Sequence, residues 1–187
     1  LVNLRDDNGK VARAIPFNYE TGNGYQAKVI KSKTYLFDDN GQMKTGVVEL
    51  GDIAAVENGA KALEAGIYYF NKESGSVKGQ MVTGKATVED DGDKYYYHFQ
   101  KDGKAYQNAV KDGILYGADG KRIAAEDGNA NMPYTVKADI EVVGKGKTIP
   151  EGTTVIVSSS GKVRTSGSVK IDGERWKVVD STTYRAA

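Results

Sequence analysis

The sequence predicts an all-β fold: tandem β-hairpin repeats stacked as a solenoid-like array, with a C-terminal β cap or small β subdomain. Three observations predict it. Glycine is abundant at 23 of 187 residues, whereas proline is scarce at 3. Tyrosine, at 12 residues, outnumbers the 4 phenylalanines and the single tryptophan, and tyrosine favours half-buried strand positions. Short runs of Tyr, Val and Ile alternate with Gly-containing turns, most clearly over 35–46.

Charge and composition argue against several classes of partner. The 26 Lys and Arg nearly cancel the 25 Asp and Glu, and the two signs are interspersed. A nucleic-acid partner would require a basic stripe to displace phosphate counterions, so none is expected. The sequence lacks an apolar run of the roughly 20 residues that span a bilayer, so no membrane span is expected. With no cysteine, disulfides and thiolate metal sites are excluded.

One pattern recurs along the chain: a short apolar or aromatic strand, three polar residues, a glycine and a second strand. Segment 35–46 is the clearest copy. Gly in these turns supplies the positive φ that lets a chain reverse between two twisted strands. Alternation along a strand predicts that Tyr35 and Phe37 share one face, as do Tyr68 and Phe70. The further copies are 68–77 (turn glycine Gly75), 97–105, 114–121, 155–163 and a fainter one at 6–11.

A second set of turns and a change of texture define the expected organisation. Turns are predicted at Asp91-Gly92, Asp112-Gly113 and Asp172-Gly173. The Ala-rich stretch 52–66 fits a helical turn or an extended hairpin loop, and its Gly59 favours the loop. From about residue 129 the strands become richer in Val, Ile and Thr, which predicts a repeat array over 1–128 and a C-terminal β subdomain over 129–187. Strands of that subdomain are expected at 136–143, 153–158, 163–171 and 174–179.

The repeats over 33–124 resemble the choline-binding and glucan-binding repeat superfamily of cell-wall-binding proteins in Gram-positive bacteria. The resemblance is carried by Tyr-Leu-Phe-Asp-Asp-Asn-Gly-Gln-Met-Lys-Thr-Gly at 35–46 and by Tyr-Tyr-Phe-Asn with Met-Val-Thr-Gly within 68–84. It implies a β-hairpin solenoid that is secreted or wall-attached and binds choline on teichoic acids or α-glucans. The compartment it implies is extracellular, at the cell wall or cell surface.

The departures from that family concern its ligand-site tryptophans. The residue after Thr-Gly is Val47 in one copy and Lys85 in the other, and the residue leading the aromatic run is Thr34 or Ile67. An aromatic cage holds a quaternary ammonium by cation–π attraction, for which Trp is the best wall. We therefore expect the architecture and the surface location to carry over, but not choline binding.

Tyrosines are the candidate ligand contacts. Those at positions matching the family are Tyr35, Tyr68, Tyr69 and Tyr97, and Tyr95 and Tyr96 extend the same run. Exposed tyrosines on a hairpin array can stack on sugar rings. The alternative is that these tyrosines pack between hairpins and favour strand formation.

No catalytic residue, metal site or cofactor is expected, and the chain is not expected to be an enzyme. His98 is the sole histidine and suits cross-strand packing. Asp38, Asn40, Gln42 and Glu49 match ligand positions of a calcium loop, but Met43 stands where its glycine is needed, so a turn followed by a strand is favoured. Asp90, Asp91 and Asp93 surround a turn glycine rather than a cleft. Trp176 is interpreted as an apolar anchor in the core of the last sheet, and the alternative is an exposed platform.

The predicted function is a non-catalytic module that attaches a secreted protein to wall polymer or carbohydrate, or that acts as a spacer. The alternative is a protein-binding adhesin or host-contact domain that presents a Tyr-rich strand surface, because tyrosine is enriched at protein interfaces. A hydrolase is the least favoured hypothesis.

Overall fold

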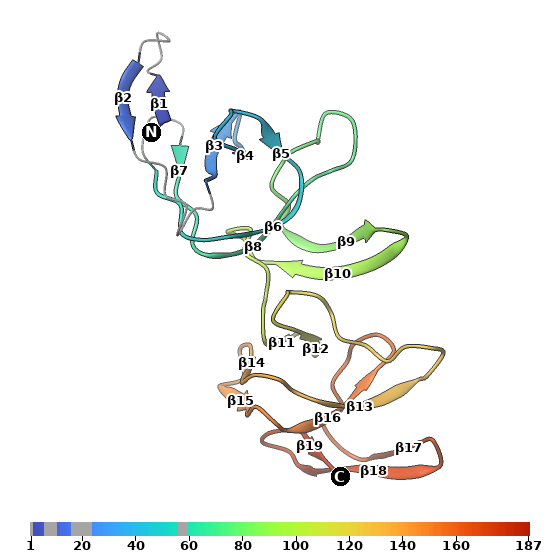
Figure 1. The fold of residues 1–187 in the computed structure, drawn as a ribbon. Coiled ribbons are helices and arrows are strands. Elements are labelled where there is room, and N and C mark those ends of the chain that lie inside the picture. Colours follow the sequence, from blue (N-terminus) through green and yellow to red (C-terminus); the bar gives the residue numbers. More distant parts are fainter. Residues whose placement is uncertain (1, 6–10, 16–23, 56–59) are drawn as a thin grey trace. The chain divides into compact units, whose positions relative to one another are not determined.

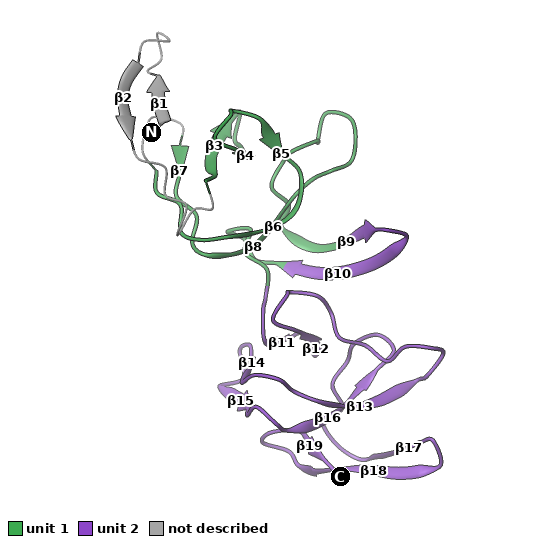
Figure 2. Cartoon of the chain, viewed as in Figure 1, with its two compact units in different colours: residues 1–86, 99–105 green, residues 87–98, 106–187 purple. Residues whose placement is uncertain are grey.

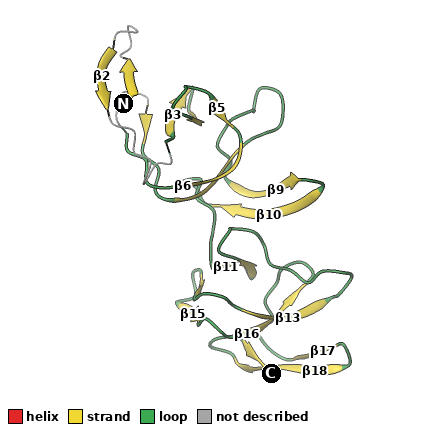
Figure 3. Ribbon diagram, in the orientation of Figure 1, coloured by secondary structure: helices red, strands yellow, loops and turns green. Residues whose placement is uncertain are grey.

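The computed structural model describes residues 2–5, 11–15, 24–55 and 60–187. Within these residues every regular element is a strand and none is a helix (Figure 3). The prediction of an all-β fold built from small hairpin sheets is confirmed. Of the faint N-terminal copy at 6–11, all but the last residue lies outside the described residues.

The chain divides into two compact units (Figure 2). Residues 1–86 and 99–105 form unit 1, and residues 87–98 and 106–187 form unit 2. This division falls inside the predicted repeat array. The predicted domain boundary at 128/129 stays a prediction.

Unit 1 contains a four-stranded sheet in the order β5-β4-β3-β7 and a two-stranded sheet of β6 and β8 (Figure 1). All these pairings are antiparallel, as is that of β1 with β2. The strands are β1 (Val2–Arg5), β2 (Val11–Ile15), β3 (Gln26–Ile30), β4 (Lys33–Phe37), β5 (Met43–Lys44), β6 (Gly46–Leu50), β7 (Ala60–Lys61) and β8 (Gly66–Phe70).

Unit 2 contains a four-stranded sheet in the order β12-β11-β14-β15, a pair of β13 and β16, and a sheet in the order β17-β18-β19. The pairing of β11 with β14 is parallel and the others are antiparallel. Strands β9 and β10 pair with each other, and most of their residues belong to this unit. The strands are β9 (Gly84–Asp90), β10 (Asp93–Phe99), β11 (Ala109–Lys111), β12 (Ile114–Tyr116), β13 (Asn131–Thr135), β14 (Ile140–Val142), β15 (Lys147–Ile149), β16 (Thr154–Ser158), β17 (Ser168–Ile171), β18 (Glu174–Asp180) and β19 (Arg185–Ala186).

Three of the predicted Asp-Gly turns are confirmed. Both residues of each turn have positive φ, for example 49° at Asp91 and 81° at Gly92, which is the conformation of a type I′ hairpin turn. Lys31 and Ser32 form a fourth such turn between β3 and β4, with φ of 49° and 67°. The sequence did not predict it because neither residue is Gly, Asn or Asp.

Five copies of the repeat share one turn, which follows a strand triplet. The triplets are Tyr35–Phe37, Tyr68–Phe70, Tyr97–Phe99, Ile114–Tyr116 and Val155–Val157. The third residue of each triplet pairs with a residue beyond the turn, here called the bridge residue. The bridge residues are Met43, Met81, Ala105, Arg122 and Val163.

Two backbone hydrogen bonds close this turn in every copy. In the first copy, Asp38 N donates to Gln42 O at 2.9 Å, and Gly41 N donates to Asp38 O at 3.0 Å. In the second copy the equivalent bonds are Asn71 N to Gln80 O and Gly79 N to Asn71 O. The turn glycine of that copy is therefore Gly79, and the prediction of Gly75 was wrong, because an exposed insertion at 72–78 lengthens the turn.

Successive copies are joined by one repeated hydrogen bond. The N–H of a bridge residue donates to the carbonyl of the residue that precedes the triplet of the copy before. In unit 1 these bonds run from Met81 N to Thr34 O and from Ala105 N to Ile67 O, each at 2.8 Å. In unit 2 they run from Arg122 N to Tyr96 O at 2.8 Å and from Val163 N to Gly113 O at 2.9 Å.

The bridge side chain packs on the turn glycine of the next copy. In unit 1, Met43 packs on Gly79 and Met81 on Gly103 so closely that a Cβ at either glycine would clash with the methionine sulfur. In unit 2, a Cβ at Gly161 would lie 2.7 Å from Cγ and Cδ of Arg122. The repeated glycine therefore serves packing between copies as well as chain reversal.

Each unit has its own apolar core. In the first copy, the predicted aromatic face of β4 is not the face that enters this core. In β4 the buried side chains are Thr34 and Leu36, so the face of Tyr35 and Phe37 is the opposite, half-buried one. The core of unit 1 comprises Ala27, Leu36, Leu50, Ile53, Leu63, Tyr68 and Phe70. That of unit 2 comprises Val110, Leu115, Val136, Ile140, Val142, Ile149, Val155, Val157, Val163 and Tyr184.

Other predicted elements differ in detail. Ile53 and Leu63 form an isolated antiparallel bridge, and the described residues of stretch 52–66 contain no helix. Residues 56–59, which include Gly59, lie outside the described residues, so a hairpin loop there stays a prediction. The predicted strand 136–143 is a strand only over 140–142, and 163–171 only over 168–171. Trp176 is half-buried on β18 and lies outside the core cluster of unit 2, so its interpretation as a core anchor was wrong.

Candidate functional site

A groove of about 1180 Å³ in unit 2 is the candidate site. Tyr95 and Tyr96 reach it from β10, Tyr134 from β13, and Lys121 and Arg122 from the turn of the fourth copy. The hydrogen bond from Arg122 N to Tyr96 O holds that turn against β10. The groove is thus built where β10 meets the fourth copy within unit 2.

The three consecutive tyrosines of β10 differ in exposure, and only Tyr95 and Tyr96 line the groove. Tyr96 is exposed at 37 %, Tyr95 is half-buried, and Tyr97 is buried at 4 %. Burial raises the pKa of Tyr134, and it raises that of Tyr97 to about 12, with Asp119 as the next cause for both. These two phenols remain neutral at ordinary pH, so each is a hydrogen-bond donor and acceptor.

A cation lies over each of the two β10 rings. Lys121 Nζ is 3.9 Å from the ring centroid of Tyr95, and Arg122 Cζ is 3.9 Å from that of Tyr96. These distances are well within the range of cation–π attraction. One face of each ring therefore carries a cation of the chain itself.

Acidic residues also border the groove. Asp119 has an Oδ1 that accepts Lys121 N–H at 2.9 Å, so this carboxylate supports its own turn. Asp93, Glu126 and Asp127 are exposed to solvent. The site therefore combines cations fixed on aromatic rings with carboxylates that stay hydrated.

The six predicted tyrosines divide into two groups. Tyr68, Tyr69 and Tyr97 are buried, at 1, 6 and 4 % exposure, and Tyr69 stacks on Phe99 with ring centroids 6.2 Å apart. Their burial favours the packing interpretation. Tyr95 and Tyr96 line the groove, whereas Tyr35 is half-buried in unit 1. For these three, contact with carbohydrate stays a prediction.

The sequence did not single out Lys121, Arg122 or Tyr134. A signal for Arg122 was present, because it stands where the two clearest copies have methionine. Tyr134 lies on β13, which belongs to no copy of the repeat, so only the folded chain brings it to the groove.

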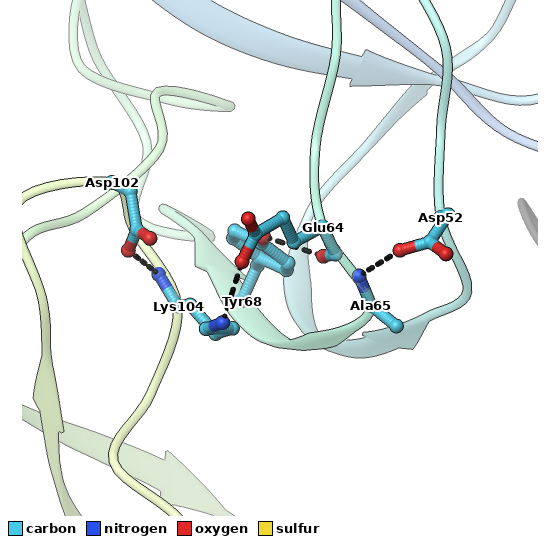
Figure 4. Close-up of polar contacts among 6 residues, drawn as sticks. All are labelled: Asp52, Glu64, Ala65, Tyr68, Asp102 and Lys104. Atoms are coloured by element: carbon cyan, nitrogen blue, oxygen red, sulfur yellow. Dashed lines mark hydrogen bonds and ion pairs between the residues drawn. The ribbon is translucent and has the colours of Figure 1, made fainter.

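A smaller pocket of about 480 Å³ in unit 1 is acidic (Figure 4). Asp52, Glu64 and Asp102 surround Tyr68, whose hydroxyl donates to the carbonyl of Glu64 at 2.7 Å. Burial first, and then these three carboxylates, raise the pKa of Tyr68 to about 12. Lys104 pairs with Glu64 at 2.8 Å. The contacts join the loop before β8 to the third turn, which is a structural role.

The candidate calcium loop at Asp38 and the sole histidine, His98, both make contacts of a structural kind. Asp38 Oδ1 accepts the N–H of Asn40 and of Gln42, as in a turn. His98 packs edge-on against Tyr106, with ring centroids 5.1 Å apart. Across the described part of the chain, no group of three or more His, Asp or Glu is placed to hold a metal ion. The same residues contain no helix long and apolar enough to cross a membrane.

Comparisons with known proteins find structural likeness only. No family model matches the sequence. No curated protein matches it either. The modular autolysin LytC from Streptococcus pneumoniae, solved with a synthetic peptidoglycan ligand, matches 80 % of this chain at 16 % identity and a TM-score of 0.31. Choline-binding protein F from the same species matches 65 % at 24 % identity and 0.24. Truncated alternansucrase from Leuconostoc mesenteroides matches 94 % at 14 % identity and 0.37.

The chain spans less than half of each of these proteins: 31 % of LytC, 43 % of choline-binding protein F and 14 % of alternansucrase. Likeness at this level assigns the chain to no family.

Proposed function

We propose that this chain is a non-catalytic cell-surface module that attaches a secreted protein to wall polymer or carbohydrate. The groove of unit 2 carries the proposal. At about 1180 Å³ it exceeds the usual size of a small-molecule pocket, which suits a segment of a polymer. Its lining combines tyrosine rings with hydrogen-bonding and charged groups, which is the surface that a polyhydroxylated chain requires. The repeats resembling wall-binding repeats support the same function.

The alternative, a flat Tyr-rich surface for a protein partner, has less support. Of the tyrosines that the structure describes, Tyr96 alone is exposed, and it borders the groove. A contiguous exposed tyrosine patch, which a flat contact surface would need, is not found among those residues.

The test is co-sedimentation of the full chain with purified Gram-positive cell walls. We expect the wild-type chain to sediment with the walls, and Tyr96→Ala to weaken binding about tenfold, because an interfacial aromatic side chain contributes about 1–3 kcal/mol. Val179→Ala is the matched control, since Val179 is an exposed apolar residue of the same unit outside the groove. Equal binding by both variants would count against the groove, and no sedimentation would refute the wall-binding role.

The non-catalytic part of the proposal has its own measurement. Walls incubated with the chain should release no more reducing ends than walls in buffer. Release that grows with the concentration of the chain would show that a catalytic group was overlooked.

A further inference from the structure

We infer that the groove of unit 2 recognises an anionic group on its ligand, through the guanidinium of Arg122 with Lys121 beside it. This inference rests on the proposed function and specifies its ligand: a saccharide or polyol chain that carries carboxylate or phosphodiester groups. The first observation is the residue type at the bridge position. Four of the five bridge residues are Met, Met, Ala and Val, and the fourth in chain order is Arg122.

If the bridge residue served only packing, an arginine would be less favourable for stability than a methionine. Its Nε is buried, and no described residue accepts a hydrogen bond from it. A buried donor without a partner costs about 1–3 kcal/mol, whereas methionine fills the same position in the first two copies without that cost. Packing on the turn glycine therefore does not explain a guanidinium here.

The guanidinium is held in place before any ligand arrives. The backbone N–H of Arg122 bonds to Tyr96 O, its Cγ and Cδ pack on Gly161, and its Cζ lies 3.9 Å from the Tyr96 ring centroid. These three contacts fix the backbone of Arg122, the aliphatic part of its side chain and its guanidinium group. Fixing a side chain in advance removes much of the entropy cost of binding through it.

The charge of Arg122 lies over the Tyr96 ring but is not paired with a carboxylate in the described part of the chain. Neither Arg122 nor Lys121 forms an ion pair with a described residue. The carboxylate of Asp119 is bonded within its own turn. The other acids of the groove are exposed, so water screens their effect on Arg122.

The ring faces point to the same ligand chemistry. A neutral sugar would stack on an open aromatic face, but Lys121 and Arg122 each cover one face of a β10 ring. A ligand on that side meets N–H donors first. A planar guanidinium matches the paired oxygens of a carboxylate or a phosphate, and charge-assisted bonds of this kind are the strong ones.

The test is isothermal titration of the full chain with three probes. They are an oligogalacturonate, which carries carboxylates, a glycerol-phosphate oligomer, which carries phosphodiesters, and maltoheptaose, which is neutral. We expect at least one anionic probe to bind at least tenfold more tightly than maltoheptaose, and which of the two does so identifies the source of the anion. Raising the salt concentration should weaken that binding.

Three variants separate charge from structure. Arg122→Met should lower affinity for the anionic probe about ten- to hundredfold while keeping the fold, because Met43 and Met81 make the equivalent contact with a turn glycine. Arg122→Lys keeps the charge but loses the planar fork, so an intermediate loss is expected. Arg164→Met is the control: it removes one positive charge from the same unit, outside the groove, and should leave affinity unchanged.

Several outcomes would overturn the inference. Equal affinity for neutral and anionic probes would do so, as would equal losses in Arg122→Met and Arg164→Met, or binding to none of the probes. Cell-wall co-sedimentation of Arg122→Met distinguishes the two proposals. Full wall binding by this variant would refute the anion inference and leave the proposed function standing, whereas failure of the wild-type chain to bind walls refutes the proposed function.

Discussion

The turn glycines allow a positive φ, and some of them also leave room for a side chain of the preceding copy. The surroundings of each glycine show whether it has one role or both. Gly41 and Gly103 occupy equivalent turn positions in unit 1, with φ of 78° and 91°. A Cβ at Gly41 would meet nothing within 4 Å, whereas one at Gly103 would meet the sulfur of Met81. The first glycine is required by the backbone alone, and the second is required by the backbone and by packing between copies.

Alanine at these two glycines should therefore have unequal effects. Gly41→Ala should lower the free energy of unfolding by about 1–2 kcal/mol, which is the cost of a left-handed conformation for a residue with a Cβ. Gly103→Ala should lower the free energy of unfolding by the same amount and by about 1–3 kcal/mol more, because the new Cβ is overpacked against Met81. Urea denaturation of both variants measures the difference. Equal losses would mean that Met81 moves aside without cost.

Asn108 occupies the position that Gly46 and Gly84 hold in the first two copies. It follows the bridge residue by three and has a φ of 47°. Asparagine tolerates this region better than other residues with a Cβ. Asn108→Ala should be destabilising by about 1 kcal/mol in thermal unfolding, whereas Asn108→Gly should be neutral or slightly stabilising. A larger loss in the glycine variant would show that the asparagine side chain, not its backbone, matters here.

The raised pKa of Tyr68 predicts an alkaline limit for unit 1. The folded-state pKa of about 12 exceeds the ordinary value of 10.0, so above pH 10 the unfolded chain loses this proton first. Stability from this group is fully present below pH 10 and is lost as the pH rises towards 12. Tyr68→Phe should reduce that decline and cost about 1 kcal/mol at neutral pH, because the bond to the Glu64 carbonyl is lost.

Urea denaturation of both proteins at several pH values between 8 and 12 tests this prediction, in roughly the range over which tyrosine titrates. A slope of stability against pH that is the same in Tyr68→Phe and in the wild-type chain would contradict it.

At the scale of elements, the repeat consists of a triplet, a turn and a bridge residue, and the turn tolerates insertion. In the second copy, residues 72–78 are exposed between Asn71 and Gly79, yet the two hydrogen bonds that close the turn are those of the first copy. An insertion in an exposed loop costs little, because loop-closure entropy rises slowly with length.

Deleting residues 72–76 should therefore restore a turn of the length seen in the first copy. We expect the free energy of unfolding to change by no more than about 0.5 kcal/mol, as measured by thermal or urea denaturation. A loss comparable to that of Gly103→Ala would show that the inserted loop contributes to the fold.

At the scale of the whole molecule, the chain forms two compact units with separate cores. Trp176, the sole tryptophan, lies on β18 of unit 2 and reports on that unit by fluorescence. A core substitution in unit 2 should therefore shift the unfolding transition of Trp176 fluorescence, whereas a core substitution in unit 1 should not.

Phe70→Ala should unfold or strongly destabilise unit 1, since truncating a fully buried Phe costs about 3–5 kcal/mol. Far-ultraviolet circular dichroism should lose part of its strand signal, while the urea transition of Trp176 fluorescence stays in place. Val157→Ala, in the core of unit 2, is the matched variant and should shift the fluorescence transition. A common shift of both signals in both variants would show one cooperative unit instead of two.

The sequence by itself determined the all-β fold and most of its turns, because these depend on neighbouring residues. Asp-Gly at 91–92, 112–113 and 172–173 sets positive φ locally, whatever the rest of the chain does. The same reasoning failed where the signal was not local. Gly75 and Gly79 look equally suitable, and only the hydrogen bonds to Asn71 and the contact with Met43 select Gly79.

The tertiary structure alone decided the candidate site. Tyr96, Arg122 and Tyr134 come from three separate segments, and the bond from Arg122 N to Tyr96 O joins two of them. Which tyrosines are buried was likewise decided by packing, because the triplet Tyr68–Phe70 buries all three of its side chains whereas Tyr35 stays half-buried. The conformation of a turn depends on adjacent residues, so a local sequence pattern predicts it. A groove depends on contacts between residues that are distant in the chain, and a local pattern does not predict those contacts.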